Sequence, residues 1–365
     1  MRLTNYWWLL IWPLLFLAIG LIVNLQRTEL VNGQRCLRWR PIAAVAFAIP
    51  YVIWAGERTL FGDTEMYRHS FQSLPESFSE IGAYMNTVQK GPGFQLFEVL
   101  FKVLISHSDV TFFLLVAAIQ LACLVYVYRK YSPSFWLSMF FFIASTDYLS
   151  WMFNGIRQFL AVSLVFLCVP LIAKRNYISA VLITLLASTI HISALVFLPF
   201  IFIVNGRSWN LRTLLFIVAI IAAIVFVDRV TGFITQAMED TVYEGDLVIL
   251  QKDDGTNIFR VLFYSVPAVM AWIFRPYLDK TDDYFINICA NLSIIAAGFY
   301  VFSFFTSGIL IGRLPIYFSL SNYILIPWLI RNVFTRDSAM VVNVSFAMVY
   351  AIFFYYQCGV FWGLL

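Results

Sequence analysis

Long, uninterrupted apolar runs constrain this chain of 365 residues more than any other feature. Apolar residues make up 61% of the chain and charged residues only 12%, about half the charge of a soluble domain. At ~20 residues for each crossing, this apolar content would fill about eleven membrane helices. The runs also lack the apolar–polar alternation of membrane barrel strands. The sequence therefore predicts an all-α polytopic membrane protein and excludes a soluble enzyme, a secreted disulfide scaffold and a disordered chain.

The runs predict about twelve transmembrane helices in one integral membrane domain, 1–365. Segment 93–106 carries Glu98 and Lys102 four residues apart on one helical face, and a crossing here would leave Arg129 and Lys130 outside. We therefore expect an interfacial or re-entrant helix at 93–106, with Glu98 and Lys102 as a structural surface pair. The predicted spans are 6–25, 41–55, 110–128, 135–152, 155–172, 177–190, 192–204, 213–227, 258–275, 286–306, 309–330 and 340–361.

Basic residues set the predicted orientation. Four arginines in 26–40 outweigh the charges before the first run, which places this loop in the cytoplasm and the N-terminus outside. If the predicted spans cross the membrane in alternating directions from there, 14 of the 24 basic residues lie in cytoplasmic turns, and loops 56–92 and 228–257 lie outside. Because the net charge of +4 reflects this distribution, no nucleic-acid partner is expected. The five cysteines show no metal-ligand spacing, and neither a metal nor a cofactor is expected.

Under this topology, cations gather on the side that the positive-inside rule should deplete. A charge within a span costs ~2.5–3.5 kcal/mol and needs a partner or water, so such residues point to function. Arginine forks match the oxygens of a pyrophosphate. Simpler interpretations stay open, because an arginine can snorkel to lipid headgroups, His191 can link two helices and Asp63 can cap a turn. The residues at the outer helix ends are Arg157, His191, Arg260 and Arg313, and those in loop 56–92 are Arg58, Asp63, Arg68 and His69.

Six sequence blocks, spread over about residues 56–330, resemble the EpsG-like and Wzy-type polysaccharide polymerases. They read GDTEMYRHSF, KGPGFQLFEVLFKVL, NGIRQFLAVSL, AKRN, LASTIHISALVFLPF and GRLPIYFSLSNYILIPWLI. The resemblance implies a GT-C-like glycosyltransferase fold in the bacterial inner membrane, with the active site facing outside. It implies transfer of a glycan from undecaprenyl pyrophosphate to the next lipid-linked repeat unit. The implied partners are this glycan donor and acceptor, the lipid bilayer, a chain-length regulator and a flippase.

For this chemistry, the leaving pyrophosphate needs cations, and the candidates are Arg157, Arg260 and Arg313. Further candidates for binding the substrate are Arg58, Arg68 and Tyr67. The attacking hydroxyl needs a general base, for which Asp63 is preferred over His191 because carboxylates are the commoner bases in GT-C enzymes. The arginines could replace a divalent ion, so a metal-independent glycosyltransferase is expected.

Three alternative functions stay open. A lipid-linked oligosaccharide flippase would show inverted repeats, which the sequence lacks. A GT-C ligase shares the chemistry of a polymerase, so the sequence does not separate the two. A membrane O-acyltransferase would use an intramembrane histidine such as His191, although no second motif supports it.

Overall fold

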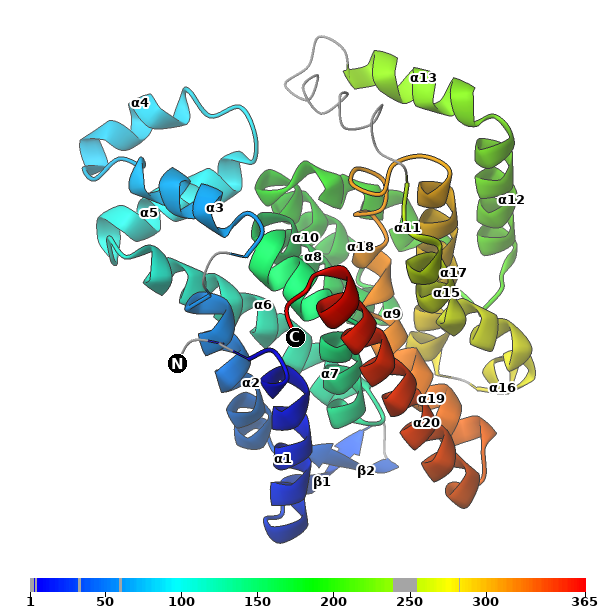
Figure 1. Ribbon diagram of the computed structural model, residues 1–365. Helices are drawn as coiled ribbons and strands as arrows, with labels where there is room; N and C mark the ends of the chain where they lie inside the picture. Colours follow the sequence, from blue (N-terminus) through cyan, green and yellow to red (C-terminus); the bar gives the residue numbers. More distant parts are fainter. Residues whose placement is uncertain (1–2, 4, 32–33, 59–60, 239–254, 282) are drawn as a thin grey trace. The chain divides into compact units, whose positions relative to one another are not determined.

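The computed structural model describes residues 3, 5–31, 34–58, 61–238, 255–281 and 283–365 (Figure 1). The described chain is mostly helical and divides into two compact units. The first comprises Met1–Leu167, Leu186–Ile192 and Phe334–Leu365, and the second comprises Cys168–Leu185 and Ser193–Val333. The single integral membrane domain expected from the sequence stays a prediction.

Helix α6, Asp109–Tyr131, lies at the core of the first unit and packs against α2 and α8. Ser108 caps its start by accepting a hydrogen bond from the Thr111 backbone, and Arg129 and Lys130 complement the dipole at its end. The other elements of this unit are α1 (Trp8–Ile22), β1 (Gln26–Val31), β2 (Gln34–Trp39), α2 (Pro41–Gly56), α3 (Thr64–Gln72), a 3-10 turn (Phe78–Glu80), α4 (Ile81–Met85), α5 (Pro92–Leu104), α7 (Phe135–Ala144), a π-helical turn (Tyr148–Asn154), α8 (Ile156–Phe166), α20 (Arg336–Tyr355) and a second π-helical turn (Tyr356–Phe361).

Strands β1 and β2 form an antiparallel hairpin where the sequence predicts only a loop between two helices. The register runs from Gln26 opposite Trp39 to Val31 opposite Gln34. The Glu29 carboxylate accepts a hydrogen bond from Arg27 at 2.8 Å and two from Arg129 at 3.2 Å, which ties the hairpin to the end of α6. The purely α-helical expectation is therefore wrong for this segment, because pairing the strands satisfies backbone groups that the hydropathy pattern ignores.

In the second unit, α17, Tyr284–Phe304, packs against α9, α12, α15, α18 and α19. Asn291 on α17 donates hydrogen bonds to the carbonyls of Val204 and Arg207, at 2.9 and 3.1 Å, which fixes the link between α11 and α12. The remaining elements are α9 (Cys168–Ala173), α10 (Tyr177–Ile190, whose last turn belongs to the first unit), a 3-10 turn (Ile192–Val196), α11 (Phe197–Ile203), α12 (Leu211–Val225), α13 (Val227–Met238), α15 (Ile258–Ile273), α16 (Arg275–Asp279), α18 (Ile316–Ser319) and α19 (Asn322–Val333).

Four described helices are long and apolar enough to cross a membrane, or five if the bent pair α12–α13 counts as one span. Six further apolar helices of 10–17 residues coincide with other predicted spans. The chain is thus an all-α membrane protein apart from its hairpin, whereas twelve crossings remain a prediction. The four long helices are α6 (Asp109–Tyr131), α8 together with α9 (Ile156–Ala173), α17 (Tyr284–Phe304) and α20 together with the π-helical turn that follows it (Arg336–Phe361).

Two predicted spans are interrupted. The helix expected at 135–152 ends at Ala144, and after Thr146, which has φ of 68°, the chain continues as a π-helical turn. The helix expected at 309–330 does not begin at residue 309, because residues 307–314 form turns and the helix is broken between Ser319 and Asn322. In these turns, a Cβ on Gly312 would lie 3.0 Å from the Gly308 carbonyl carbon, so only a glycine fits at this position.

The two predicted outer loops contain helices. Loop 56–92 holds α3 and α4, and loop 228–257 begins within α13. Helix α5 has 13 residues, or about 20 Å, and lies within the segment 93–106, for which a non-crossing helix stays a prediction. Loop 228–257 is rich in acidic residues, and six of them lie outside the described residues: Glu239, Asp240, Glu244, Asp246, Asp253 and Asp254.

Candidate functional site

Asp63 is positioned by contact between two of the sequence blocks. It precedes α3, and its backbone N–H donates to Asn154 Oδ1 at 2.9 Å. The preceding Gly62 has φ of +51°, and a Cβ there would overlap Asn154 Oδ1 and lie 2.7 Å from Asn154 Cγ. A glycine is therefore required both for the turn and for the approach. The Asp63 side chain makes no capping bond to α3, so its half-buried carboxylate is not used as a helix cap.

Arg157 lies three residues after Asn154, in the first turn of α8. It is half-buried, and its Nε is buried without a hydrogen-bond partner among the described residues. Its Nη1 would lie 3.4 Å from a Cβ on Gly91, which has φ of +63°, so this glycine leaves room for the guanidinium. The positive end of the helix dipole adds to the charge of the side chain. This end of α8 is therefore suited to an anion.

Tyr67 joins Asp63 and Arg157 in one cluster. It lies one turn along α3 from Asp63, and its hydroxyl is close enough to Arg157 and Asp63 to be influenced by their charges. Burial raises the pKa of Tyr67, the positive charge of Arg157 lowers it and the negative charge of Asp63 raises it. The phenol thus stays protonated near neutral pH and can donate a hydrogen bond to a ligand.

The predicted surface pair of Glu98 and Lys102 is wrong. Both side chains are buried, at 1% and 3% exposure, because α5 packs against α3, α4 and α6. The Lys102 ammonium turns away from Glu98 and donates to the carbonyls of Gln72 and Leu74 at 2.8 and 2.7 Å. Both carboxyl oxygens of Glu98 are buried with no hydrogen-bond partner in the described chain. Burial raises the pKa of Glu98 to about 8, although the charge of Arg157 acts to lower it.

Arg58 is engaged within the protein. It is 2% exposed, donates to Ala55 O at 2.7 Å and Thr64 Oγ1 at 3.1 Å, and lies 4.1 Å from the Phe113 ring centre. Burial lowers the pKa of Arg58 to about 10. Arg58 thereby joins the end of α2 to the start of α3.

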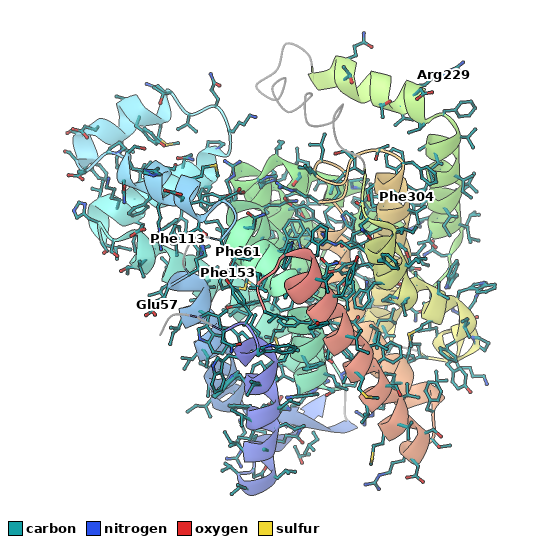
Figure 2. The ribbon with its side chains drawn as sticks, viewed as in Figure 1. Glu57, Phe61, Phe113, Phe153, Arg229 and Phe304 are labelled. Atoms are coloured by element: carbon teal, nitrogen blue, oxygen red, sulfur yellow. The ribbon has the colours of Figure 1, made fainter. Side chains whose placement is uncertain are left out.

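Arg68 and a pair of aromatic rings strengthen the same junction. Arg68 donates to the Arg58 carbonyl at 2.8 Å and pairs with Asp109 at 3.2 Å. The rings of Phe61 and Phe153 meet edge to face, with centres 5.7 Å apart (Figure 2). These contacts hold the loop that carries Asp63, while binding of substrate by Arg58 or Arg68 stays a prediction.

His191 follows the last residue of α10, and its backbone N–H donates to Ala187 O at 3.0 Å. The segment before it packs on the start of α5. A Cβ on Gly91 would lie 2.8 Å from the Ile190 carbonyl oxygen, and one on Gly93 would lie 2.8 Å from Thr189 Cβ. Because Gly91 also borders Arg157, the KGPG, NGIRQ and STIHIS blocks meet in the first unit.

Arg260 and Arg313 belong to the second unit. Arg260 lies in the first turn of α15, 6.0 Å from the Tyr264 ring centre, and Arg313 is exposed in the turns before α18. The nearby Thr256 joins these segments, because its backbone donates to Ser303 O at 3.1 Å and its hydroxyl would lie 2.5 Å from a Cβ on Gly312. The two arginines therefore lie toward the same end of this unit.

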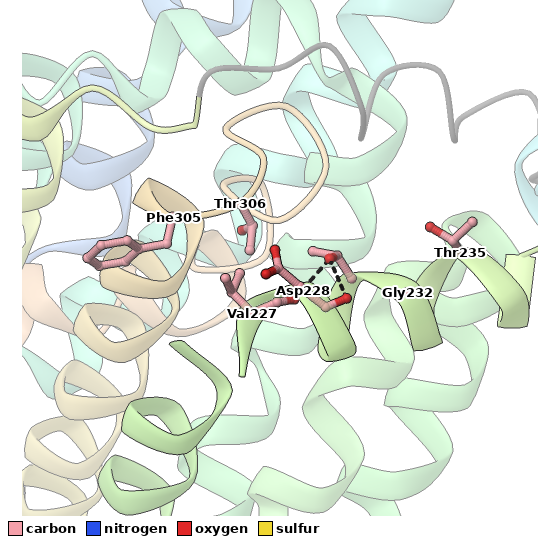
Figure 3. A pocket seen from close by; sticks show the side chains of 7 residues that line it. Val227, Asp228, Gly232, Thr235, Phe305 and Thr306 are labelled. Carbon is pink, nitrogen blue, oxygen red and sulfur yellow. Dashed lines mark hydrogen bonds between the residues drawn. The ribbon is translucent and has the colours of Figure 1, made fainter. Parts of the chain in front are cut away.

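A pocket of about 410 Å³ lies between α13 and the residues after α17, also in the second unit (Figure 3). Asp228 lines it, and the Thr231 hydroxyl donates to the carbonyls of Val227 and Asp228 at 2.9 and 3.1 Å. The other lining residues are Gly232, Thr235, Phe305 and Thr306.

Two residues of the first cluster were not predicted as site residues. Asn154 has a sequence signal, since it precedes Gly155 and Arg157 in the NGIRQ block. Glu98 has one too, as an acid within an apolar helix, but the i,i+4 lysine favoured a solvent-exposed pair. Among the residues that the structure describes, no group of three or more His, Cys, Asp or Glu side chains could hold a metal ion.

The fold and the first cluster define an all-α membrane protein with an arginine, a tyrosine and two carboxyl groups gathered at a helix start. The family model for EpsG matches residues 42–360, and the chain belongs to the EpsG family. This confirms the resemblance to EpsG-like polysaccharide polymerases and indicates a polysaccharide polymerase-type function. No curated protein and no solved structure gives a significant match to the chain.

Proposed function

We propose that this protein is a glycosyltransferase that polymerises undecaprenyl-pyrophosphate-linked repeat units into a surface polysaccharide. It acts at the outer face of the bacterial inner membrane, with about twelve crossings and a GT-C-like arrangement. Family membership supports the reaction class. The observation that carries the proposal is Arg157, a half-buried cation at a helix start whose Nε makes no hydrogen bond among the described residues.

The arginine suits the leaving group of this reaction. The acceptor hydroxyl attacks the anomeric carbon of the donor glycan, and the bond to the pyrophosphate oxygen breaks. The polyprenyl pyrophosphate leaves with the bonding electron pair, so negative charge grows on its oxygens. Arg157 stabilises this charge through its fork of N–H donors and the positive end of α8. Tyr67 donates a further hydrogen bond. Arg260 and Arg313, which belong to the second unit, are further candidates for binding a lipid-linked substrate.

The proton of the attacking hydroxyl passes to Asp63. Its carboxylate is half-buried and free of any capping bond, while its backbone is fixed by Asn154. His191 binds or polarises the acceptor. The reaction is metal-independent, because arginines supply the positive charge that a divalent ion supplies elsewhere.

The experiment separates the two proposed roles. Purified protein is given lipid-linked repeat units, and turnover and binding are measured separately for Asp63→Asn and His191→Gln. Loss of a general base costs typically 10²–10⁴-fold in rate, so Asp63→Asn should bind substrate but form no polymer. His191→Gln should form less polymer, partly restored by more substrate.

Other outcomes assign the residues differently. Near-normal polymerisation by Asp63→Asn, together with an inactive His191→Gln that still binds, would make His191 the base. Transfer of finished glycan to a different lipid, without chain growth, would identify a ligase and contradict the polymerase proposal.

A further inference from the structure

Glu98 is an ionisable group for which the reaction above has no use. Its carboxyl group is 1% exposed, and neither oxygen has a hydrogen-bond partner in the described chain. Its i,i+4 neighbour Lys102 is occupied by two backbone carbonyls. An ionised carboxylate left in this state would carry a large desolvation cost, so the neutral acid is favoured.

Arg157 is close enough for its charge to act on this carboxyl group. An ionised carboxylate beside an arginine normally forms an ion pair, yet Glu98 and Arg157 form none in the structure, and Arg157 Nε is also unpartnered. The neutral acid thus leaves the full positive charge of Arg157 available to an outside anion. If Glu98 lost its proton, its negative charge would compete with an outside anion for the same guanidinium.

We propose that Glu98 controls anion binding at Arg157: the neutral acid leaves the arginine available to a pyrophosphate, and the carboxylate competes for it. Glu98 is therefore a positioning residue that acts through Arg157. This inference rests on the proposed function, because it takes the ligand of Arg157 to be a lipid pyrophosphate.

The competition predicts a pH dependence with a definite sign. Glu98 is neutral below its raised pKa of about 8, so binding is full there and weakens as the pH rises above it. Loss of this one proton would lower affinity by about tenfold between pH 7 and pH 9. By reciprocity, a bound pyrophosphate makes Glu98 harder to ionise.

Other titratable groups lie on the elements around Glu98. Tyr67 on α3 and Tyr84 on α4 face it, and burial raises the pKa of both phenols, so they stay neutral in this range. The other charged groups nearby include Lys102 on α5, held by its two carbonyls and 3.6 Å from the exposed Glu76 carboxylate, Asp109 on α6, paired with Arg68, and Asp63 and His191. The charge of Glu98 adds to the raised pKa of both phenols, but burial is the larger cause and remains in the variant, so both stay neutral there too. Wild type and Glu98→Gln therefore differ only in the group that titrates at position 98.

The test measures binding of undecaprenyl pyrophosphate to the full-length protein in nanodiscs between pH 6.5 and 9.5. Glu98→Gln mimics the neutral acid in size and charge, so it should fold and bind as tightly as wild type at pH 7. Wild type should lose about tenfold in affinity by pH 9, and Glu98→Gln should lose only what the ionisation of the lipid itself causes. Glu65→Gln, which removes an exposed carboxylate from α3, should behave as wild type.

The possible failures are distinguishable. An equal pH dependence in wild type and Glu98→Gln would overturn this inference and leave the proposed function intact. Weak binding by Glu98→Gln at pH 7, while Glu65→Gln binds normally, would also overturn this inference. It would show that a neutral side chain at position 98 is not enough to keep Arg157 available to the pyrophosphate. Absence of lipid binding by wild type at every pH would contradict the proposed function itself.

Discussion

Gly62→Ala tests the contact that positions Asp63. Gly62 has φ of +51°, a conformation that costs an L-residue roughly 1–2 kcal/mol. The added Cβ would lie 2.7 Å from Asn154 Cγ and would displace the amide that accepts from Asp63 N–H. Losing this neutral hydrogen bond costs about 0.5–1.5 kcal/mol. The total destabilisation is therefore about 1.5–3.5 kcal/mol.

The assay combines the thermal unfolding midpoint of the purified protein with its polymerisation rate. Gly62→Ala should lower both, while Asn154→Ala should cost only the hydrogen bond. The added Cβ at position 62 overlaps only the Asn154 side chain. The Gly62→Ala/Asn154→Ala double variant should therefore lose less stability than the sum of the losses of the two single variants. Gly82→Ala is the matched control, because a Cβ there meets nothing within 4 Å. A Gly62→Ala protein as stable and active as Gly82→Ala would refute the reasoning.

Two further predictions concern the core and the topology. Lys102→Met keeps the length of the side chain but leaves the carbonyls of Gln72 and Leu74 without their donor. The free energy of unfolding measured in urea should therefore fall by about 2–4 kcal/mol. A fall below ~1 kcal/mol would contradict a structural role for Lys102. With the native Cys36 replaced, a cysteine introduced at position 240 should react with an impermeant maleimide added outside, and one at position 34 should not, because positive charges place loop 26–40 inside. The opposite labelling pattern would overturn both the orientation and the outward-facing site.

The positions of the helices could largely be predicted from hydropathy. The predicted spans at 110–128, 155–172 and 286–306 correspond closely to long helices, because a continuous apolar run needs its backbone bonds satisfied internally. Interruptions were not predictable in the same way. The π-helical turn at Tyr148–Asn154 and the glycine-packed turns at 307–314 depend on close contacts in the folded chain, which hydropathy does not report.

The candidate site was predictable in its residue types but not in its grouping. Charge at helix ends pointed to Arg157 and His191, and the structure brings their blocks together around Gly91. It assigns Arg260 and Arg313 to the other unit and engages Arg58 in internal bonds. Glu98 was misjudged because its spacing to Lys102 says nothing about which face of α5 is covered. The covered face of α5 is set by its packing against α3, α4 and α6. The hydrophobic pattern of α5 alone does not indicate these contacts.

The most direct test of the central claim is in vitro polymerisation of undecaprenyl-pyrophosphate-linked repeat units by Arg157→Lys, with Arg229→Lys on α13 as the control. Lysine keeps the charge but cannot reproduce the bidentate fork. The loss of one charge-assisted hydrogen bond, about 1.5–3 kcal/mol, corresponds to a roughly 10- to 150-fold slower reaction. Cells carrying Arg157→Lys should therefore hold single repeat units on the lipid and no long chains, while the control makes normal chains. A normal ladder of chain lengths from both Arg157→Lys and Arg157→Ala would remove Arg157 from the site and contradict the account.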